Sequence, residues 1–351
     1  MNVHILLREK FTAGYINFIN DNFNAEENIF FLYGNVDEYN EDHIKNKTNV
    51  RNIEDAKKEF LITAYTCKRI LIHSLSVSNK LLLFLGLQKS MLKKCNWIIW
   101  GADLYEYRIP KKTYKEKRRE SLRRKVIRNI GAVSTLVKND YTILKEWYDT
   151  DAIHYDARYV DSEKDSYLQK IRNTVTKDSE EVNIIVGNSA TKSNRHIEVL
   201  NLLSRFKDEN IKIYCPLSYG DLEYSKSIQE SGNELFGDKF IPLTEFMDMK
   251  EYMDFLNKMD VGIFNNDRQQ GLGNICALIY LGKKVYLREN TSMKDEMREL
   301  MVKTFDIDDI RNQKIEMLSY ISEKDRENNY KMIKPIYDTE DSKKLWKRIL
   351  T

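Results

Sequence analysis

The sequence predicts an α/β protein built from two successive parallel-sheet domains with a cleft between them. Short apolar runs alternate with helical patterns, which is typical of parallel sheets covered by helices. The pattern stops at a charged stretch near residues 158–180, the expected linker, and then starts again. At 351 residues the chain is long enough for two hydrophobic cores. We expect a first domain over 1–160, a second over 178–325, and a helical tail over 326–351 that could pack back on the first domain.

The first half contains five apolar runs that predict buried strands, with helical patterns between them. A charged and polar segment separates the fourth and fifth strands. The expected strands are 2–7, 29–33, 70–72, 97–100 and 130–134. The expected helices are 13–23, one between 52 and 70, 79–95 and 137–147.

The second half repeats this alternation, which predicts a second α/β unit. Its last residues, DSKKLWKRIL, form an amphipathic helical pattern. The expected strands are 182–186, 211–215, 240–241, 261–264 and 285–287. The expected helices are 194–203, 226–231, 249–258, 275–281 and 341–350.

The stretch 259–290 predicts a strand, a polar loop and an apolar helix that opens with glycines. Arg268 lies in the loop, and Gly271-Leu272-Gly273-Asn274 begins the helix. A helix N-terminus carries unpaired N–H groups and a partial positive charge, and glycines let an anion approach the backbone. Arg268 adds a permanently charged, planar donor group. The stretch predicts a diphosphate-binding loop, with an ordinary strand-to-helix turn as the alternative.

Composition is typical of a soluble globular protein, with 42% hydrophobic residues. The four cysteines lie far apart without a C-x-x-C spacing, so we expect reduced thiols in a cytosolic protein rather than disulfides or a zinc site. The apolar part of the first residues is too short for a signal peptide. No uncharged apolar run reaches the roughly 18 residues of a membrane span.

Positive charge is concentrated in residues 108–128. This segment has eleven Lys or Arg and two Glu, so its charge of +9 leaves the rest of the chain at −6, given the formal total of +3. A partial apolar stripe accompanies it, and the Leu-rich helix 79–95 precedes it. Together they predict contact with an anionic membrane surface. A solvated helix beside a core helix is the alternative, and nucleic-acid binding is disfavoured because no nucleic-acid motif is present.

Polar residues follow several of the expected strands. They are His73, Asp103, Gly187 to Ser189, and Arg268 to Asn274. Because ligands of open α/β sheets bind beyond the carboxyl ends of the strands, we expect these residues to contribute to a site.

Three segments resemble one bacterial family. They are WIIWGADLYEY (97–107), IIVGNSATKSNRHIEVL (184–200) and RQQGLGN (268–274). They resemble the TDP-N-acetylfucosamine:lipid II N-acetylfucosaminyltransferases, the 4-alpha-L-fucosyltransferase family (glycosyltransferase family 56). These enzymes add 4-acetamido-4,6-dideoxygalactose to a polyprenyl-diphosphate disaccharide in enterobacterial common antigen assembly. The resemblance implies a GT-B fold of two Rossmann-like domains facing a central cleft, an inverting reaction and no essential metal.

Asp103 and His73 are the candidate catalytic residues. An inverting transfer needs a base for the attacking hydroxyl. Asp103 follows an apolar strand through two small residues, which would let it point into the cleft. Its alternative is a helix cap or a partner of Arg108. His73 ends a strand and could assist as a base, or it could be a structural histidine bonded at the strand end.

The donor site is expected in the second domain. Gly187 and its neighbours offer N–H groups near a diphosphate, Tyr219 could stack on the base or sugar, and Glu289 could accept from a ribose hydroxyl. Helix capping, solvated side chains and an ordinary turn are the alternatives. The candidate donor-binding residues are Gly187, Asn188, Ser189, Asn194, Arg195, Tyr219, Arg268, Gln269, Gln270, Gly271, Gly273, Asn274 and Glu289.

Two D-x-D spacings, at 149–151 and 306–308, are the only motifs that suggest a metal. Neither directly follows a strong apolar strand, so we expect no metal site. The candidate membrane-contact residues are Lys111, Lys112, Lys115, Lys117, Arg118, Arg119, Arg123 and Arg124.

The sequence therefore predicts a glycosyltransferase that moves an amino-deoxy sugar from a TDP or UDP donor to a polyprenyl-diphosphate glycan in surface polysaccharide assembly. We expect it to be cytoplasmic and peripheral on the inner face of the cell membrane, with no cofactor and no nucleic-acid partner. A sugar-nucleotide epimerase with the same two-domain fold is one alternative. A non-catalytic nucleotide-sugar-binding module is the other.

Overall fold

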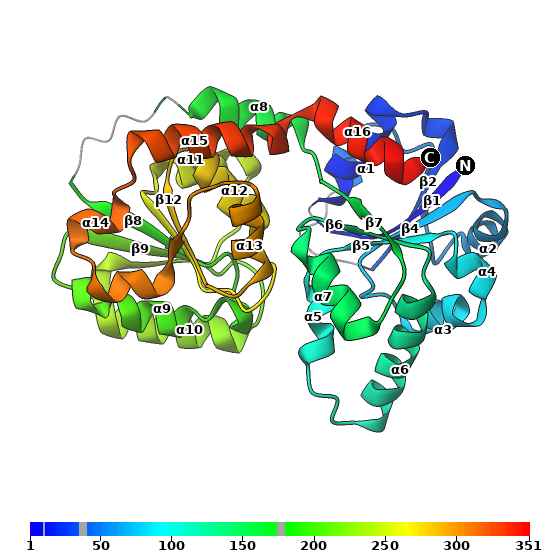
Figure 1. The fold of residues 1–351 in the computed structure, drawn as a ribbon, viewed down its shortest axis with the longest axis horizontal. Helices are drawn as coiled ribbons and strands as arrows, with labels where there is room; N and C mark the ends of the chain where they lie inside the picture. Colours follow the sequence, from blue (N-terminus) through cyan, green and yellow to red (C-terminus); the bar gives the residue numbers. More distant parts are fainter. Residues whose placement is uncertain (10, 35–40, 173, 175–179) are drawn as a thin grey trace. The chain divides into compact units, whose positions relative to one another are not determined.

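The computed structural model describes residues 1–9, 11–34, 41–172, 174 and 180–351 (Figure 1). The chain forms two compact units. The first contains Met1–Ser162 together with Asp338–Thr351, and the second contains Glu163–Tyr337.

The first unit is built on a seven-stranded parallel sheet with the order β3-β2-β1-β4-β5-β6-β7. Numbered along the chain this is the order 3-2-1-4-5-6-7, so the sheet is doubly wound from its first strand outward. The strands are β1 (Asn2–Leu7), β2 (Asn28–Tyr33), β3 (Val50–Asn52), β4 (Arg69–His73), β5 (Cys95–Ile99), β6 (Ala132–Thr135) and β7 (Ile153–Asp156).

Helices cover both faces of this sheet because its strands are apolar on both sides. In β1, Val3 and Ile5 face one core cluster and Leu6 faces the other, as the alternation of strand side chains requires. One face carries α2 (Lys57–Thr66), α3 (Asn79–Leu87), α4 (Lys89–Leu92), α6 (Tyr114–Asn129) and α7 (Asn139–Tyr148). The other face carries α1 (Thr12–Asn22) and α16 (Thr339–Leu350).

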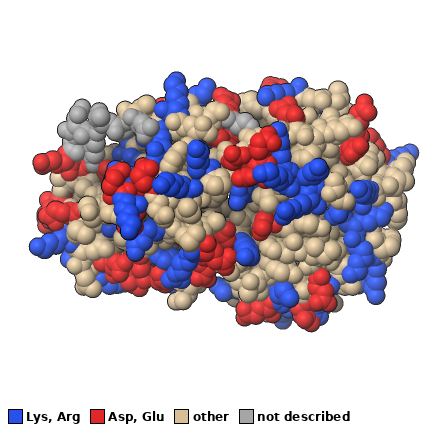
Figure 2. All heavy atoms as spheres, turned by 45° about the horizontal axis from the view of Figure 1, so that its top comes forward, with Lys and Arg blue, Asp and Glu red and all other residues tan. Residues whose placement is uncertain are grey.

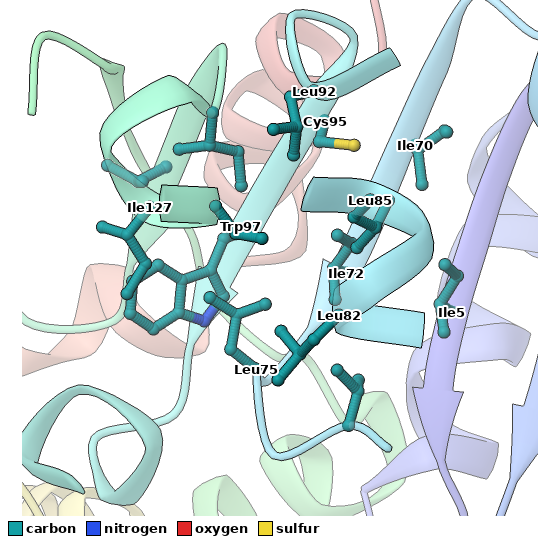
Figure 3. Packing of buried hydrophobic residues seen from close by; sticks show 14 of the residues in the cluster. Ile5, Ile70, Ile72, Leu75, Leu82, Leu85, Leu92, Cys95, Trp97 and Ile127 are labelled. Atoms are coloured by element: carbon teal, nitrogen blue, oxygen red, sulfur yellow. The ribbon is translucent and has the colours of Figure 1, made fainter. Parts of the chain in front are cut away.

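Figure 3 shows the packing of the first of these faces. Ile5, Ile72 and Trp97 of the sheet meet Leu82 and Leu85 of α3, and all five side chains are buried. On the opposite face, Trp346 of α16 is fully buried, and its indole N–H donates to the Arg158 carbonyl at 2.7 Å. The C-terminal helix is thus part of the core of the first unit.

The second unit contains a six-stranded parallel sheet with the order β10-β9-β8-β11-β12-β13. Its strands are β8 (Val182–Val186), β9 (Ile211–Pro216), β10 (Phe240–Leu243), β11 (Val261–Phe264), β12 (Lys284–Leu287) and β13 (Phe305–Asp306). Numbered along the unit, this is the 3-2-1-4-5-6 order of dinucleotide-binding folds.

Helices also lie on both faces of the second sheet (Figure 1). One face carries α9 (His196–Leu203) and α10 (Leu222–Phe236), and the other carries α11 (Met249–Lys258), α12 (Leu272–Tyr280) and α15 (Glu323–Ile333). The remaining helices are α8 (Ser162–Ile171), α13 (Ser292–Glu299) and α14 (Ile315–Ser319).

All ten strands expected from the sequence are present, but three further strands were missed. These are β3, β7 and β13, which lie at sheet edges and have the polar sequences VRN, IHYD and FD. The expected linker 158–180 was wrong over Ser162–Ile171, which form α8, and residues 173 and 175–179 lie outside the described part. The single helix expected over 79–95 is broken at Gln88 into α3 and α4.

Candidate active site

The second sheet reverses its winding between β8 and β11. The chain leaves β8 toward β9 and β10, then returns to place β11 on the other side of β8. The loops that follow these two strands, 187–195 and 265–271, therefore leave the carboxyl edge of the sheet side by side. Ligands of open α/β sheets bind at such a switch point.

The loop after β8 turns at Gly187, which has a φ of +69°. A Cβ at this position would lie 2.5 Å from Nε2 of His196, so only glycine fits here. Farther along, Asn194 Nδ2 donates to the Ser189 carbonyl at 2.8 Å. The loop is thus folded back over the start of α9.

The loop after β11 is hydrogen-bonded to the loop after β8. Gln270 accepts from Ser193 Oγ at 2.6 Å, and its amide nitrogen donates to Ser189 Oγ at 3.3 Å. Asn266 Nδ2 donates to the Gln270 carbonyl at 2.9 Å. These bonds fix the two loops against each other, which preorganises the edge at which a ligand would bind.

The helix α12 begins at this edge without a side-chain cap. Its N-cap is Gly271, with a φ of +67°, and a Cβ there would approach Asn188 Oδ1 to 3.1 Å. Arg268 is partly buried just before it, and its Nη1 donates to the Gln269 carbonyl at 3.0 Å. An uncapped helix start beside a guanidinium is suited to an anion.

Buried polar atoms without a hydrogen-bond partner are concentrated in these two loops and at the start of α9. Among the described residues there are fourteen such side-chain atoms in all, and six belong here. They are Asn188 Oδ1, Asn194 Oδ1, both ring nitrogens of His196, Asn266 Oδ1 and Gln269 Oε1. Because an unsatisfied buried polar group costs about 1–3 kcal/mol, their concentration favours a site that a polar ligand completes.

Two of these amides have an orientation that their neighbours fix. Asn194 and Asn266 each donate to a backbone carbonyl, which accepts only, so the remaining atom must be the oxygen. Both side chains are buried. The switch point therefore offers acceptors for hydroxyl or N–H groups, in addition to donors for an anion.

Aromatic hydroxyls lie beside the same edge. Tyr219 Oη accepts from Asn188 Nδ2 at 3.1 Å, and Tyr252 Oη of α11 accepts from Asn274 Nδ2 at 2.8 Å. The sequence analysis missed Tyr252, because it lies inside an ordinary amphipathic helix and no local pattern marks it.

Arg195 and Glu289 are held in ion pairs. Arg195 bonds Glu198 and Asp267, the latter at 3.2 Å. Glu289 pairs with Lys294 at 3.2 Å and with Arg298. The donor roles of both residues remain predictions, and for Glu289 the two cations favour a structural role over ribose binding.

Asp103 of the first unit is buried, with only 1% of its surface exposed. Its carboxylate accepts from the Leu75 N–H at 3.0 Å, the Trp97 indole at 2.6 Å and the Trp100 N–H at 3.0 Å. Both oxygens are therefore engaged in holding the loops after β4 and β5. This geometry favours a structural role for Asp103 that is neither the helix cap nor the Arg108 pairing considered above, and its catalytic role remains a prediction.

His73 is also fully buried. Its Nδ1 is bonded to the Tyr159 hydroxyl, its ring is stacked on Trp346, and Nε2 has no partner among the described residues. Burial holds the pKa of His73 well below 6.5, so the ring is neutral at physiological pH. A catalytic role for His73 remains a prediction.

The basic segment forms α6, which begins with a capping box between Thr113 and Glu116. Arg123 was wrongly expected at a membrane surface, because its side chain is fully buried and donates to the Asp103 carbonyl at 2.6 Å. Arg119 and Arg124 pair with Glu106 and Glu120, while Lys112, Lys115, Lys117 and Arg118 are exposed.

The described residues contain no group of three or more His, Cys, Asp or Glu that could hold a metal ion. In the two D-x-D spacings, Asp149 is the C-cap residue of α7, and Asp306 Oδ1 accepts from the Asp308 N–H at 3.1 Å. Both therefore have structural roles that account for them. Nor does any described helix have the length and hydropathy needed to cross a bilayer.

Several solved structures with the same fold are glycosyltransferases. A glycosyltransferase from Rickettsia africae ESF-5 has a TM-score of 0.65 at 12% identity over 99% of this chain and 97% of its own. WaaG, a glycosyltransferase involved in lipopolysaccharide biosynthesis, has a TM-score of 0.60 at 11% identity over 100% of this chain and 98% of its own. An alpha,alpha-trehalose-phosphate synthase (UDP-forming) from Burkholderia vietnamiensis has a TM-score of 0.63 at 9% identity over 100% of this chain and 99% of its own. The fold is of the GT-B type, with two Rossmann-like domains.

The family assignment is more specific. The 4-alpha-L-fucosyltransferase family, glycosyl transferase group 56, matches residues 16–346. The chain belongs to this family and is a glycosyltransferase, so the family resemblance found in the sequence is confirmed and an epimerase or a non-catalytic module is disfavoured.

Proposed function

We propose that this glycosyltransferase transfers an amino-deoxy sugar of the N-acetylfucosamine type from a TDP or UDP donor to a polyprenyl-diphosphate-linked glycan. The acceptor glycan is a precursor of a surface polysaccharide, and the enzyme works at the inner face of the cell membrane. The observation that carries the proposal is the set of unpartnered buried polar atoms around the uncapped start of α12.

The two kinds of polar group at the switch point fit the two parts of such a donor. The N–H groups of α12 and the Arg268 guanidinium bind the diphosphate, whose negative charge grows as the bond to the sugar breaks. The amide oxygens of Asn194 and Asn266 accept hydrogen bonds from sugar hydroxyls or an acetamido N–H. Because Arg268 and the start of α12 supply positive charge to the leaving diphosphate, the transfer needs no metal ion. Inversion follows from direct displacement by the acceptor hydroxyl on the face opposite the leaving group.

Calorimetric titration with TDP, UDP, GDP and inorganic diphosphate tests the donor site. We expect the Arg268→Ala variant to bind the preferred nucleotide about 10- to 100-fold more weakly, since a lost hydrogen bond to a charged group costs about 1.5–3 kcal/mol. Arg311→Ala is the matched control, because Arg311 is an exposed arginine that pairs with Asp308 at 3.1 Å. Equal affinity of wild type and Arg268→Ala would contradict the assignment, and a preference for UDP would change the sugar class only.

An apolar surface on the first unit supports membrane contact. Exposed large apolar side chains occur on α2, on α3 and at the entry to α6. They are Leu61, Ile62, Tyr65, Leu83, Leu87, Ile109 and Tyr114. The α2 and α3 helices are neighbours through the Tyr65–Phe84 ring contact, and α3 packs on α6. Soluble proteins rarely expose so many apolar side chains together unless the surface binds something.

Charge makes an anionic membrane the matching partner. Lys112, Lys115, Lys117 and Arg118 are exposed near Ile109 and Tyr114 in the chain, at the entry to α6 and on its first turns, and each can add about 1 kcal/mol near an anionic leaflet. On the face drawn in Figure 2, positively and negatively charged side chains are interspersed.

Flotation with anionic liposomes tests this contact. We expect a variant with Lys112, Lys115, Lys117 and Arg118 changed to Gln to float several-fold less than wild type, and the difference to vanish in high salt. Arg123 is left unchanged because its loss would unfold the unit. A variant with Gln at the exposed Lys207, Lys226, Lys314 and Lys324 has the same net charge and should float normally. Equal flotation of all three proteins would exclude the membrane role.

A further inference from the structure

A chain of side-chain hydrogen bonds links the two loops at the switch point of the second sheet. Ser193 Oγ lies 2.6 Å from Gln270 Oε1, and Gln270 Nε2 lies 3.3 Å from Ser189 Oγ. A distance of 2.6 Å is typical of an O–H···O bond and is shorter than ordinary N–H···O bonds. The oxygen of the Gln270 amide therefore faces Ser193, and its nitrogen donates to Ser189.

The Ser189 hydroxyl uses its whole hydrogen-bonding capacity inside the protein. Its Oγ accepts from Gln270 Nε2 and, at 3.4 Å, from Asn194 Nδ2. A serine hydroxyl has two lone pairs and one proton, so both lone pairs are engaged. The proton is left for Thr191 Oγ1, which lies 2.8 Å from Ser189 Oγ. Ser189 therefore donates to Thr191.

Thr191 is thereby left with a hydroxyl proton to offer. Its Oγ1 accepts from Ser189, and no acceptor for its own proton is found in the part of the chain that the structure describes. Thr191 is half-buried, whereas only 1% of the surface of Ser189 is exposed. The sequence analysis did not single out Thr191, because the direction of its hydroxyl depends on Gln270 in a distant loop.

Backbone N–H groups of the same two loops also lack acceptors. Among the described residues, none is found for the N–H groups of Asn188, Ser189, Leu272 and Gly273. The first two follow β8, and the last two open α12. Neighbouring N–H groups of this kind bind anions. Because Ser189 supplies both an N–H of this set and the Oγ that holds Thr191, the Thr191 hydroxyl lies beside these donors.

We propose that the Thr191 hydroxyl donates a hydrogen bond to the diphosphate of the sugar donor. The inference rests on the proposed function and adds a residue to its donor site. Ser189 orients Thr191 and contacts the diphosphate through its N–H. Negative charge on the diphosphate grows as the bond from the sugar to the phosphate breaks, so the bond from Thr191 strengthens in the transition state.

Calorimetric titration with inorganic diphosphate tests this role. Thr191→Val keeps the shape of the side chain and removes the hydroxyl. We expect it to bind diphosphate about 10- to 100-fold more weakly than wild type, as for a lost hydrogen bond to a charged group. Thr191→Ser keeps the hydroxyl and loses only the methyl group, so its affinity should stay close to that of wild type.

Ser193→Ala separates contact with the ligand from support of the loops. It removes the bond between Ser193 and Gln270 and leaves the Thr191 hydroxyl in place, so the affinity for diphosphate should fall by a few-fold at most. Equal affinity of wild type and Thr191→Val would overturn the assignment. So would a loss in Thr191→Ser or Ser193→Ala as large as that in Thr191→Val. If wild type binds neither TDP nor inorganic diphosphate, the proposed function fails, and the role of Thr191 fails with it.

Discussion

The protein is expected to lose more than about 4 kcal/mol of its free energy of unfolding when the pH falls from 7.5 to 5. Burial lowers the pKa of His4 and of His196 to about 4, and that of His73 falls well below 6.5. Below pH 6.5 the unfolded chain binds a proton at each of these rings and the folded chain does not, so acid favours unfolding. At pH 5 each ring with a folded pKa near 4 costs about 2 kcal/mol.

The neighbours of His4 explain why its ring stays neutral in the fold. The Asn28 side-chain nitrogen donates to the Asn24 carbonyl at 2.9 Å, so the Asn28 side-chain oxygen faces Nε2 of His4 at 3.1 Å. Because this oxygen can only accept, Nε2 must carry the proton. Tyr15 then donates to Nδ1 at 3.0 Å. Both ring nitrogens are satisfied without a charge, and a second proton would have to enter a fully buried site.

Urea unfolding at several pH values measures this effect. The stability should rise with pH between 5 and 6.5 and level off above that range. His4→Gln retains one donor and one acceptor. It should reduce the slope of the free energy of unfolding against pH by the equivalent of about one proton, whereas His43→Gln, at an exposed position, should leave this slope unchanged. A stability that is constant between pH 7.5 and 5 would show that the buried rings are protonated in the folded state.

The sequence was sufficient for the fold wherever burial makes strands apolar. The central strands β1, β4, β8 and β11 are mostly apolar, because parallel strands are covered on both faces. Edge strands lack that signal, as the polar β3 shows. The Arg268 to Asn274 loop was recognisable because glycines and an arginine before a helix have a direct physical meaning.

Side-chain direction was the part of the site that sequence could not supply. Arg123 lies in a run of arginines and lysines, and nothing local distinguishes it from its exposed neighbours; its burial depends on carbonyls from distant segments. Asp103 follows a strand, as a catalytic residue often does. Its role is nevertheless determined by three hydrogen-bond donors, on Leu75, Trp97 and Trp100, that the local sequence pattern does not reveal. Likewise, the unpartnered oxygens of Asn194 and Asn266 exist only because backbone carbonyls hold the other half of each amide.

Asp103→Ala is expected to destabilise the protein by about 3–5 kcal/mol. Alanine would leave the N–H groups of Leu75, Trp97 and Trp100 without an acceptor, and each buried unsatisfied donor costs about 1–3 kcal/mol. The same three bonds join the loops after β4 and β5, so their loss also loosens the edge that carries His73. The measurement is the free energy of unfolding in urea at pH 7.5, a pH at which the buried histidines are neutral in both states.

Asp103→Asn separates the structural role from catalysis. Asparagine has the size of aspartate but presents an NH₂ group to at least one of the three donors, so a structural Asp103 predicts a loss of stability of roughly 1–3 kcal/mol. Asp55→Ala is the control, since Asp55 is an exposed carboxylate bonded to Asn52 and its loss should cost less than about 0.5–1 kcal/mol. An Asp103→Asn protein with wild-type stability and greatly reduced turnover would instead support Asp103 as the base.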